Sequence, residues 1–280
     1  MTPGDPPPAA TWRPPAPLDG LVLVDKPAGK TSHDLTLATR RALGIRKAGH
    51  AGTLDPFATG LLLVLVGRAR RVQRFLMALP KQYVTVARLG AISTTGDPEG
   101  EITETGRLPA LDAPLPTGQI MQRPPIWSAV RVQGRKAYER ARAGEQFEMA
   151  PREVTVYRFE LLERSGDRAE FLVECSAGTY VRSLIAELGD AYCVELRRTK
   201  IGPFDVADAD PTRVLPLDRA LAFLPRVEVD ADAAWRAAHG QAIAGDAQDE
   251  HVLIVDADGP VAIAQPHEDG LLKPVVGFRG

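Results

Sequence analysis

The stretch that decides the reading of this sequence is residues 49–60, Gly-His-Ala-Gly-Thr-Leu-Asp-Pro-Phe-Ala-Thr-Gly. Its three glycines predict tight turns or a close approach to another backbone. Pro56 favours an extended backbone at Asp55, which can direct the Asp55 side chain out of the loop. From these residues alone, the loop either presents a carboxylate to a ligand, or Asp55 caps the segment after Pro56.

The sequence around this loop is strongly basic. Residues 35–80 contain a single acid, Asp55, among many arginines. A basic surface attracts a polyanion, and a lone carboxylate within it is a candidate for chemistry; the alternative is a solvated positive face with an incidental aspartate. Residues 226–280 carry ten acids against four bases, whereas the remainder carries 30 bases against 26 acids. The overall net charge of −2 therefore hides a basic body and an acidic C-terminal segment.

The composition bounds the class of protein. The 280 residues suffice for one large domain and a small one. Two cysteines and scattered histidines predict a cytoplasmic protein with no disulfide scaffold and no metal site. The longest aliphatic run, 61–66, is too short to span a bilayer, so no membrane partner is expected. Residues 1–19 are proline-rich and are predicted to be a disordered tail.

Hydrophobic patterns predict an α+β fold. Strands and helices mix without regular alternation, which favours a largely antiparallel sheet. We expect strands at 21–25, 61–66, 81–89 and 170–175, helices from Thr31 or Ser32 to 43, at 69–79 and at 181–189, a surface excursion at 95–118, and a C-terminal hairpin formed by 251–256 and 259–264.

Gly29-Lys30-Thr31 follows a strand and precedes a helix, as a phosphate-binding loop would. Such a loop requires a glycine where this chain has Val24, and Pro27 removes a backbone donor. Binding of ATP or GTP is therefore not expected.

A longer set of motifs is more specific. Asp25-Lys26-Pro27-x-Gly29-x-Thr31-Ser32 is followed by Gly49-His50-x-Gly52-x-Leu54-Asp55-Pro56-x-Ala58-x-Gly60. The next matches, in order, are Lys81-x-Tyr83, Leu89-Gly90, residues 128–144, residues 175–182 and Leu196-Arg197-Arg198. This collinear series, over residues 20–205, resembles the TruB family of tRNA pseudouridine synthases. The chain departs from the family pattern between Gly189 and Leu196, where only six residues stand and a longer segment is usual.

The resemblance implies a fold and a division into domains. The expected fold is that of pseudouridine synthases, with a mixed, largely antiparallel central sheet flanked by helices and a small C-terminal β-rich domain of the PUA type. The expected catalytic domain spans 20–225 and includes an insertion at about 121–150 that clamps RNA. The PUA-like domain would occupy 226–280.

The resemblance also implies an activity. Uridine 55 in the TψC arm of tRNA would be flipped out of its stack and isomerised to pseudouridine. The reaction needs no cofactor. The implied partner is tRNA, and the enzyme is expected to be a monomer with no obligatory protein partner. The carboxylate could attack C1′, attack C6, or take a proton from C2′; the sequence leaves these three open. Two rival functions also remain, an RNA-binding or RNA-folding protein without catalysis and a pseudouridine synthase for another RNA.

Site residues follow from the matching positions. Asp55 resembles the essential aspartate, Arg182 its arginine partner, and Tyr83 the tyrosine that stacks on the target base. A phosphate contact for Arg182 and a core position for Tyr83 are the alternatives. The remaining implied substrate-binding residues are His50, which would fill the space left by displaced nucleotides, Tyr180, which would support the pocket, Leu196, which would pack on the base, and Lys26, Arg71, Arg131, Arg135, Lys136 and Arg142, which would contact phosphates.

Overall fold

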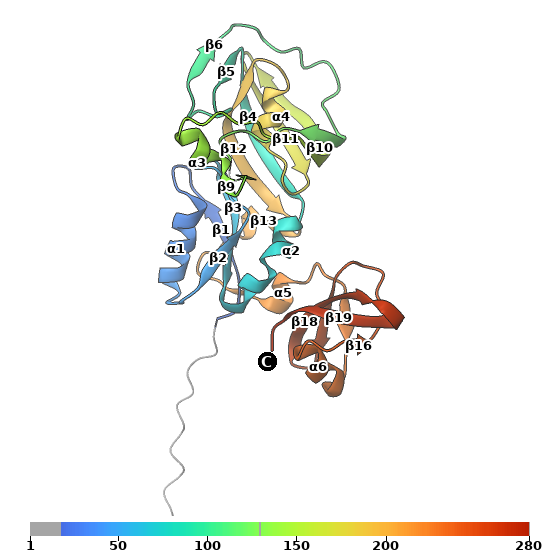
Figure 1. Cartoon of the computed structure of the whole chain (residues 1–280). Coiled ribbons are helices and arrows are strands. Elements are labelled where there is room, and N and C mark those ends of the chain that lie inside the picture. The colour runs from blue at the N-terminus through green and yellow to red at the C-terminus, as the bar shows by residue number, and fades with distance from the viewer. Residues whose placement is uncertain (1–17, 129, 280) are drawn as a thin grey trace, which may run out of the picture.

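The computed structural model describes residues 18–128 and 130–279 (Figure 1). Ten strands form its main sheet: β1 (Gly20–Lys26), β2 (Ala48–Ala51), β3 (Thr59–Val66), β4 (Lys81–Leu89), β7 (Gly118–Gln122), β10 (Arg152–Ser165), β11 (Arg168–Cys175), β12 (Ala191–Ile201), β13 (Phe204–Asp205) and β14 (Leu215–Pro216). The order is β14-β1-β3-β12-β4-β11-β10-β7, with β2 beside β3 and β13 beside β12. Only β12 and β3 run parallel, so the sheet is largely antiparallel, as predicted.

Short helices flank this sheet. They are α1 (Ser32–Ala42), the 3-10 helix η1 (Gly67–Val72), α2 (Gln73–Ala78), α4 (Val181–Ala186), the 3-10 helix η2 (Val206–Asp208) and α5 (Leu217–Ala220). Thr31 caps α1, because its hydroxyl accepts from the Asp34 N–H while the Asp34 carboxylate accepts from the Thr31 N–H.

Two predicted helices are shorter than expected. The stretch 69–79 is divided into η1 and α2, and neither begins with a side chain that caps its N-terminus. The helix predicted at 181–189 ends at Ala186, because the chain turns at Gly189 and Ala191 already pairs with Leu89 on β4. The short segment 190–195 is therefore mostly strand, and it places Leu196 within β12.

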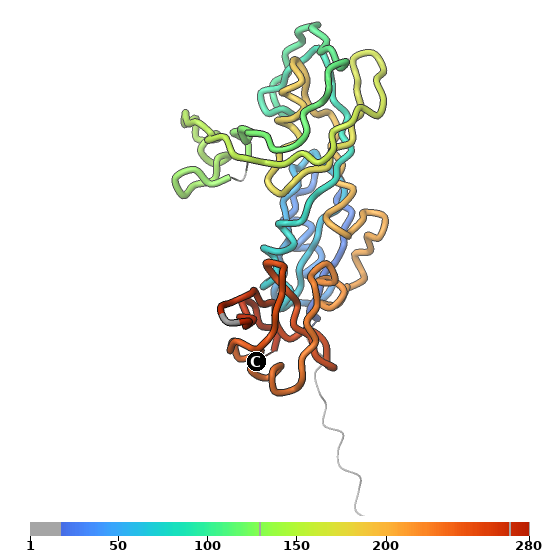
Figure 2. Tube along the Cα trace, turned by 90° about the vertical axis from the view of Figure 1, so that its right-hand side faces the viewer, coloured from blue at the N-terminus to red at the C-terminus, as the bar shows by residue number. Residues whose placement is uncertain are grey.

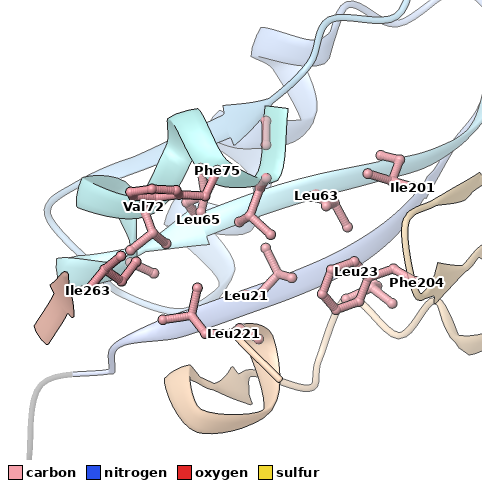
Figure 3. Close-up of a cluster of buried hydrophobic side chains, with 14 of the residues drawn as sticks. Leu21, Leu23, Leu63, Leu65, Val72, Phe75, Ile201, Phe204, Leu221 and Ile263 are labelled. Carbon is pink, nitrogen blue, oxygen red and sulfur yellow. The ribbon is translucent and has the colours of Figure 1, made fainter. Parts of the chain in front are cut away.

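Part of the core lies on both faces of β1 and β3, and a separate apolar cluster lies around β4, β11, β12 and α4. The side chains of β1 and β3 alternate between two apolar clusters, which explains the continuous apolar runs in the sequence. Figure 3 shows the first cluster, and the second lies under α1. Because β2 and β3 are neighbours in this packed region, the loop 52–58 between them is anchored at both ends. The first cluster includes Leu21, Leu23, Leu63 and Leu65, and the second includes Val22, Val24, Leu62 and Val64.

A second, five-stranded sheet follows in the C-terminal part. It contains β15 (Arg226–Glu228), β16 (Ile243–Ala244), β17 (Val252–Asp256), β18 (Gly259–His267) and β19 (Leu271–Gly277), with α6 (Ala231–Ala238) and the 3-10 helix η3 (Glu268–Gly270). The predicted hairpin is confirmed as β17 and β18. Leu253, Ile263 and Phe278 join the first core cluster, so this sheet packs against the main one.

The segment 123–151 between β7 and β10, which we call the arm, stands apart from both sheets. It contains a small hairpin, β8 (Arg131–Val132) with β9 (Arg135–Lys136), and the helix α3 (Ala137–Arg142). Figure 2 shows it as the yellow-green segment that projects from the side of the body. A second small hairpin, β5 (Ala91–Ser93) with β6 (Ile102–Glu104), lies within the predicted surface excursion.

Most of the predicted disordered tail, 1–17, lies outside the described residues. Asp19, at its end, is held by Arg68, whose Nε lies 2.6 Å from Asp19 Oδ2. Among the described helices, none combines the length and the apolar character needed to cross a membrane.

Candidate active site

The loop that carries Asp55 is supported by the preceding motif, residues 25–32. Ser32 Oγ accepts from the Leu54 N–H at 2.9 Å and lies 3.3 Å from the Leu54 carbonyl oxygen, to which it donates. The Gly29 N–H donates to the Pro56 carbonyl at 2.9 Å. The two residues that flank Asp55 are thus fixed through their backbones, and the Gly29-Lys30-Thr31 sequence supports a loop instead of enclosing a phosphate.

Lys26 completes this support, which corrects the prediction that it contacts a phosphate. The side chain is fully buried, and its Nζ donates to the carbonyls of Pro27, Lys30 and Pro56 at 3.0, 2.7 and 3.1 Å. Its three donors are satisfied by three carbonyls. Burial lowers the pKa of Lys26, and the negative charge of Asp55 opposes that shift. The lysine therefore holds the two loops together from inside the protein.

Gly60 closes the loop against β12. Its φ is +100°, and a Cβ at this position would lie 2.2 Å from the Arg198 carbonyl oxygen. Gly60 pairs with Arg198 in the one parallel contact of the sheet. The buried Arg198 guanidinium then reaches back, with Nε donating to the Leu61 carbonyl at 2.8 Å and Nη2 to the Gly52 carbonyl at 3.1 Å. The glycines at 52 and 60 permit this close approach of backbone and arginine.

The Asp55 side chain points to Arg182, at the start of α4. Arg182 Nε lies 2.9 Å from Asp55 Oδ2. The Asp55 side chain exposes 32% of its surface and the Arg182 side chain 3%, so the carboxylate is the accessible member of the pair. Asp55 does not cap the segment after Pro56 with its side chain. The Ala58 N–H donates to the Asp55 backbone carbonyl, and the carboxylate is left to pair with Arg182.

A second carboxylate shares the arginine. Asp97 Oδ2 lies 2.9 Å from Arg182 Nη1, and Asp97 is 4% exposed. Arg182 also donates to two carbonyls, from Nη1 to Thr95 at 2.6 Å and from Nη2 to Trp127 at 2.9 Å. A planar guanidinium with five donors suits such a crossing point. These four contacts together orient the Arg182 guanidinium.

The electrostatic environment of Asp55 contains opposing effects. Burial raises the pKa of the Asp55 carboxyl, the positive charge of Arg182 lowers it, and the negative charge of Asp97 raises it again. The net direction is upward from the ordinary value. A carboxylate with a raised pKa is a stronger base than a solvated aspartate, and the positive charge of Arg182 stabilises its ionised form.

Asp55 opens into a cavity of about 340 Å³. This volume lies in the range of pockets that hold small ligands. Apolar side chains and aromatic rings form one part of the wall, and cations form another. The residues that matter here are Tyr83, Leu196 and Tyr180 for the first part, and Arg182, Arg198, Lys81 and Arg152 for the second.

Tyr83 and Lys81 line the cavity from the first residues of β4. Burial raises the pKa of Tyr83, an effect that the charge of Arg198 opposes, so the phenol stays protonated at neutral pH. Burial lowers the pKa of Lys81 to about 8, and the charge of Arg198 acts in the same direction. The Lys81 Nζ donates to the carbonyls of Met77 and Leu79, so it ties the end of α2 to the cavity wall.

Comparison with known proteins identifies the family of this site. The family model described as the N-terminal domain of TruB family pseudouridylate synthases matches residues 40–181, which include Asp55 and end one residue before Arg182. The chain belongs to the TruB family. A relative from Thermobifida fusca named tRNA pseudouridine synthase B is 41% identical over 290 residues, covering 94% of this chain and 99% of that protein. A relative of the same name from Nocardia farcinica is 46% identical over 239 residues, covering 79% and 76%.

Solved structures agree with this TruB assignment. The structure described as a Cbf5-Nop10-Gar1 complex has a TM-score of 0.67 and 27% identity, covering 93% of this chain and 84% of the other. The structure of an H/ACA RNP bound to a substrate RNA containing 2'-deoxyuridine has a TM-score of 0.67 and 25% identity, covering 93% and 85%. The predicted family, its α+β pseudouridine synthase fold with a C-terminal β-rich domain, and its class as an isomerase are confirmed.

In this TruB chain the cavity unites only part of the predicted site. Asp55, Tyr83, Arg182, Tyr180 and Leu196 line it together. The remaining predicted residues lie elsewhere: His50 on β2, Arg71 on η1, Arg131 on β8, Arg135 and Lys136 on β9, and Arg142 on α3.

His50 and Arg71 lie outside the cavity lining, on different elements. Burial lowers the pKa of His50, as does the nearby charge of Arg198. The His50 carbonyl accepts from Gln73 Nε2 at 2.6 Å. Arg71 is exposed and donates through Nη1 to the Gly277 carbonyl at 2.8 Å, so it lies where the two sheets meet.

The four predicted bases of the arm form a group of their own. Arg131 and Arg135 are exposed on the hairpin, where Arg135 Nη1 lies 2.6 Å from Glu145 Oε1. Lys136 Nζ and the Arg142 guanidinium both lie over the Tyr138 ring, at 5.3 and 5.6 Å from its centre. Lys136 and Arg142 are thus held near the same aromatic ring of the arm.

Sequence reasoning missed several residues of the site. Asp97 fell within the predicted surface excursion, because its glycine-rich and acidic neighbours suggest solvent. Arg198 and Lys81 stood inside the quoted motifs but received no role, and their position in the motifs was the available signal. Gln122, which is buried and bonded to Tyr180, gave none. Within 18–128 and 130–279, no group of three or more His, Cys, Asp or Glu side chains is arranged to hold a metal ion.

Proposed function

We propose that this chain isomerises uridine 55 in the TψC arm of tRNA to pseudouridine, with Asp55 as the carboxylate that acts on the flipped nucleotide. The observation that carries the proposal is the accessible Asp55 carboxylate, oriented by a buried arginine at the wall of a cavity. The relatives named tRNA pseudouridine synthase B support tRNA as the substrate.

The chemistry is balanced within the substrate. The bond between C1′ and N1 breaks, C1′ joins C5, and the proton on C5 is lost as N1 gains one. Arg182 approaches Oδ2 of Asp55, which leaves Oδ1 to face the ribose or the base. That oxygen serves attack at C1′, attack at C6 or removal of the C2′ proton alike. Tyr83, protonated at neutral pH, lies on the same wall and would stack on the base and handle the C5 proton.

The surroundings of the cavity suit a base removed from its stack. Leu196 would pack against the uracil, and Tyr180 would support the opposite wall. His50, on β2 next to the loop, would fill the space that displaced nucleotides leave. Reaching Asp55 inside a cavity requires the nucleotide to leave its helix, so flipping follows from the position of the carboxylate.

RNA binding would use surfaces beyond the cavity. The cations of the arm would clamp the tRNA by contacts with phosphates, and Arg71 would contribute a further phosphate contact. We assign residues 20–225 to the catalytic domain and 226–280 to a PUA-like domain. The enzyme would act as a monomer in the cytoplasm without an obligatory protein partner. The PUA-like domain carries ten acids and four bases, and this excess of acids repels phosphates, so this domain would contact RNA through a limited part of its surface.

The test is incubation of the purified chain with unmodified tRNA, followed by mapping of pseudouridine. The expected result is one pseudouridine at position 55, with no product from a matched tRNA that carries cytidine there. Binding without product would favour the RNA-binding alternative. Product in another RNA, with tRNA unmodified, would favour the other synthase.

A further inference from the structure

The base of the arm is hydrogen bonded to the start of α4. Gln122, the last residue of β7, is fully buried. Its Oε1 accepts from the Tyr180 N–H at 2.7 Å, and its Nε2 donates to the Tyr180 carbonyl at 3.1 Å. One side-chain amide therefore satisfies both backbone groups of the residue that precedes α4.

The other end of the arm grips the same turn. Gln122 pairs across the sheet with Arg152, the first residue of β10. Arg152 Nη2 donates to the Gly178 carbonyl at 2.8 Å, and its guanidinium lies 5.2 Å from the centre of the Tyr180 ring. Both strands that connect the arm to the sheet thus hold the turn 178–180.

The first residues of the arm continue this contact along α4. Arg182 Nη2 donates to the Trp127 carbonyl at 2.9 Å, and Ser183 Oγ donates to the Arg123 carbonyl at 3.2 Å. Because Arg182 also binds Asp55 through Nε, one rigid guanidinium joins the arm to the carboxylate. A shift of the Trp127 carbonyl would turn the plane of the guanidinium and move Nε away from Asp55.

We propose that Gln122 is a positioning residue for the isomerisation. It fixes Tyr180 and the start of α4 so that Arg182 engages Asp55 and the base of the arm at the same time. Seating of the arm on RNA is thereby coupled to the geometry of the reacting carboxylate. The inference rests on the proposed function and adds the path through which the arm acts on the site.

The first test replaces Gln122 with methionine, which has a similar length and packs well but makes neither hydrogen bond. Single-turnover formation of pseudouridine is measured with enzyme in excess over unmodified tRNA, together with the tRNA dissociation constant. The expected rate falls at least about tenfold, because misplacing a reacting group by about 1 Å has effects of this size or larger. Affinity stays within roughly threefold, since the fully buried Gln122 offers no surface for a phosphate contact. Gln119→Met, an exposed position on the same strand, should keep the wild-type rate.

The second test separates positioning from folding. Ser183→Ala removes only the hydroxyl that bonds Arg123, and alanine favours the helix, so the thermal midpoint should not fall. Its rate should fall about threefold, in line with the loss of one hydrogen bond. A wild-type rate for Gln122→Met would overturn the inference. The inference would also be overturned if the rate of Gln122→Met fell only in proportion to the fraction of that variant that is folded, while Ser183→Ala reacted at the wild-type rate. A wild-type chain that makes no pseudouridine would reject the proposed function instead.

Discussion

Substitutions of Arg182 can separate the effect of its positive charge from the effect of its hydrogen-bonding geometry. We consider two substitutions, Arg182→Lys and Arg182→Met. The guanidinium makes four contacts at once, to Asp55, to Asp97 and to the carbonyls of Thr95 and Trp127. A lysine keeps the positive charge but has one nitrogen, which cannot reach two carboxylates and two carbonyls on different sides. A methionine keeps the volume and removes the charge.

The structure sets the size of each effect. A charge-assisted contact contributes about 1.5 to 3 kcal/mol, so a lysine that loses the ion pair with Asp55 should react roughly ten- to a hundredfold more slowly. The methionine variant leaves Asp97, 4% exposed, without its cation. Breaking a buried pair in this way costs about 3 to 5 kcal/mol of stability.

The two variants also differ in pH dependence. Asp55 acts in its charged form, which is present above its pKa. The charge of Arg182 lowers that pKa, so its removal raises it further above the ordinary value. The acid limb of the rate profile should move to higher pH for Arg182→Met, and it should move less for Arg182→Lys, which keeps the positive charge but loses the direct contact. Single-turnover rates of pseudouridine formation across pH provide the assay. A methionine variant with an unmoved acid limb, or a lysine variant at the wild-type rate, would refute the reasoning.

Three further predictions follow from the supports of the loop and from the arm. Gly60→Ala should lower the free energy of unfolding in urea by more than about 3 kcal/mol, because the new Cβ would lie 2.2 Å from a backbone oxygen. Gly44→Ala is the control, because Gly44 also has a positive φ, +63°, but has open space around it. This variant should lose only about 1 kcal/mol of stability. Lys26→Met should lower stability and rate but leave the salt dependence of tRNA binding unchanged, since it removes hydrogen bonds to three loop carbonyls and no contact to a phosphate. Reversing the charge of Arg131 and Arg135 together should weaken tRNA binding and flatten its salt dependence by roughly one unit per lost phosphate contact, and unchanged binding would reject the clamp.

The sequence reached those parts of the fold whose signals are local. β4 has the predicted bounds 81–89, because its alternating pattern is bounded by Pro80 and Gly90. The start of α1 followed from the cap at Thr31. The division of 69–79 into two short helices depends on how these residues pack on β2 and the core, which no local pattern records.

The site was predictable only where a motif marked it. Asp55 stood out as a lone acid, but its pairing with Arg182 came from the family resemblance. Asp97 was missed because its burial depends on an arginine far along the chain. Lys26 was misassigned because a lysine in a basic sequence suggests a surface, whereas three carbonyls from two loops receive its ammonium group. Such satisfaction of a buried charge is a property of the folded state.

The role of the carboxylate at position 55 is tested most directly by Asp55→Asn in the single-turnover assay, with tRNA affinity measured in parallel. The amide keeps the size of the side chain but cannot act as nucleophile or base. We predict no detectable pseudouridine and a dissociation constant within about fivefold of wild type, because RNA is held chiefly through its phosphates. Formation of pseudouridine by the asparagine variant at a rate near that of wild type would contradict the account.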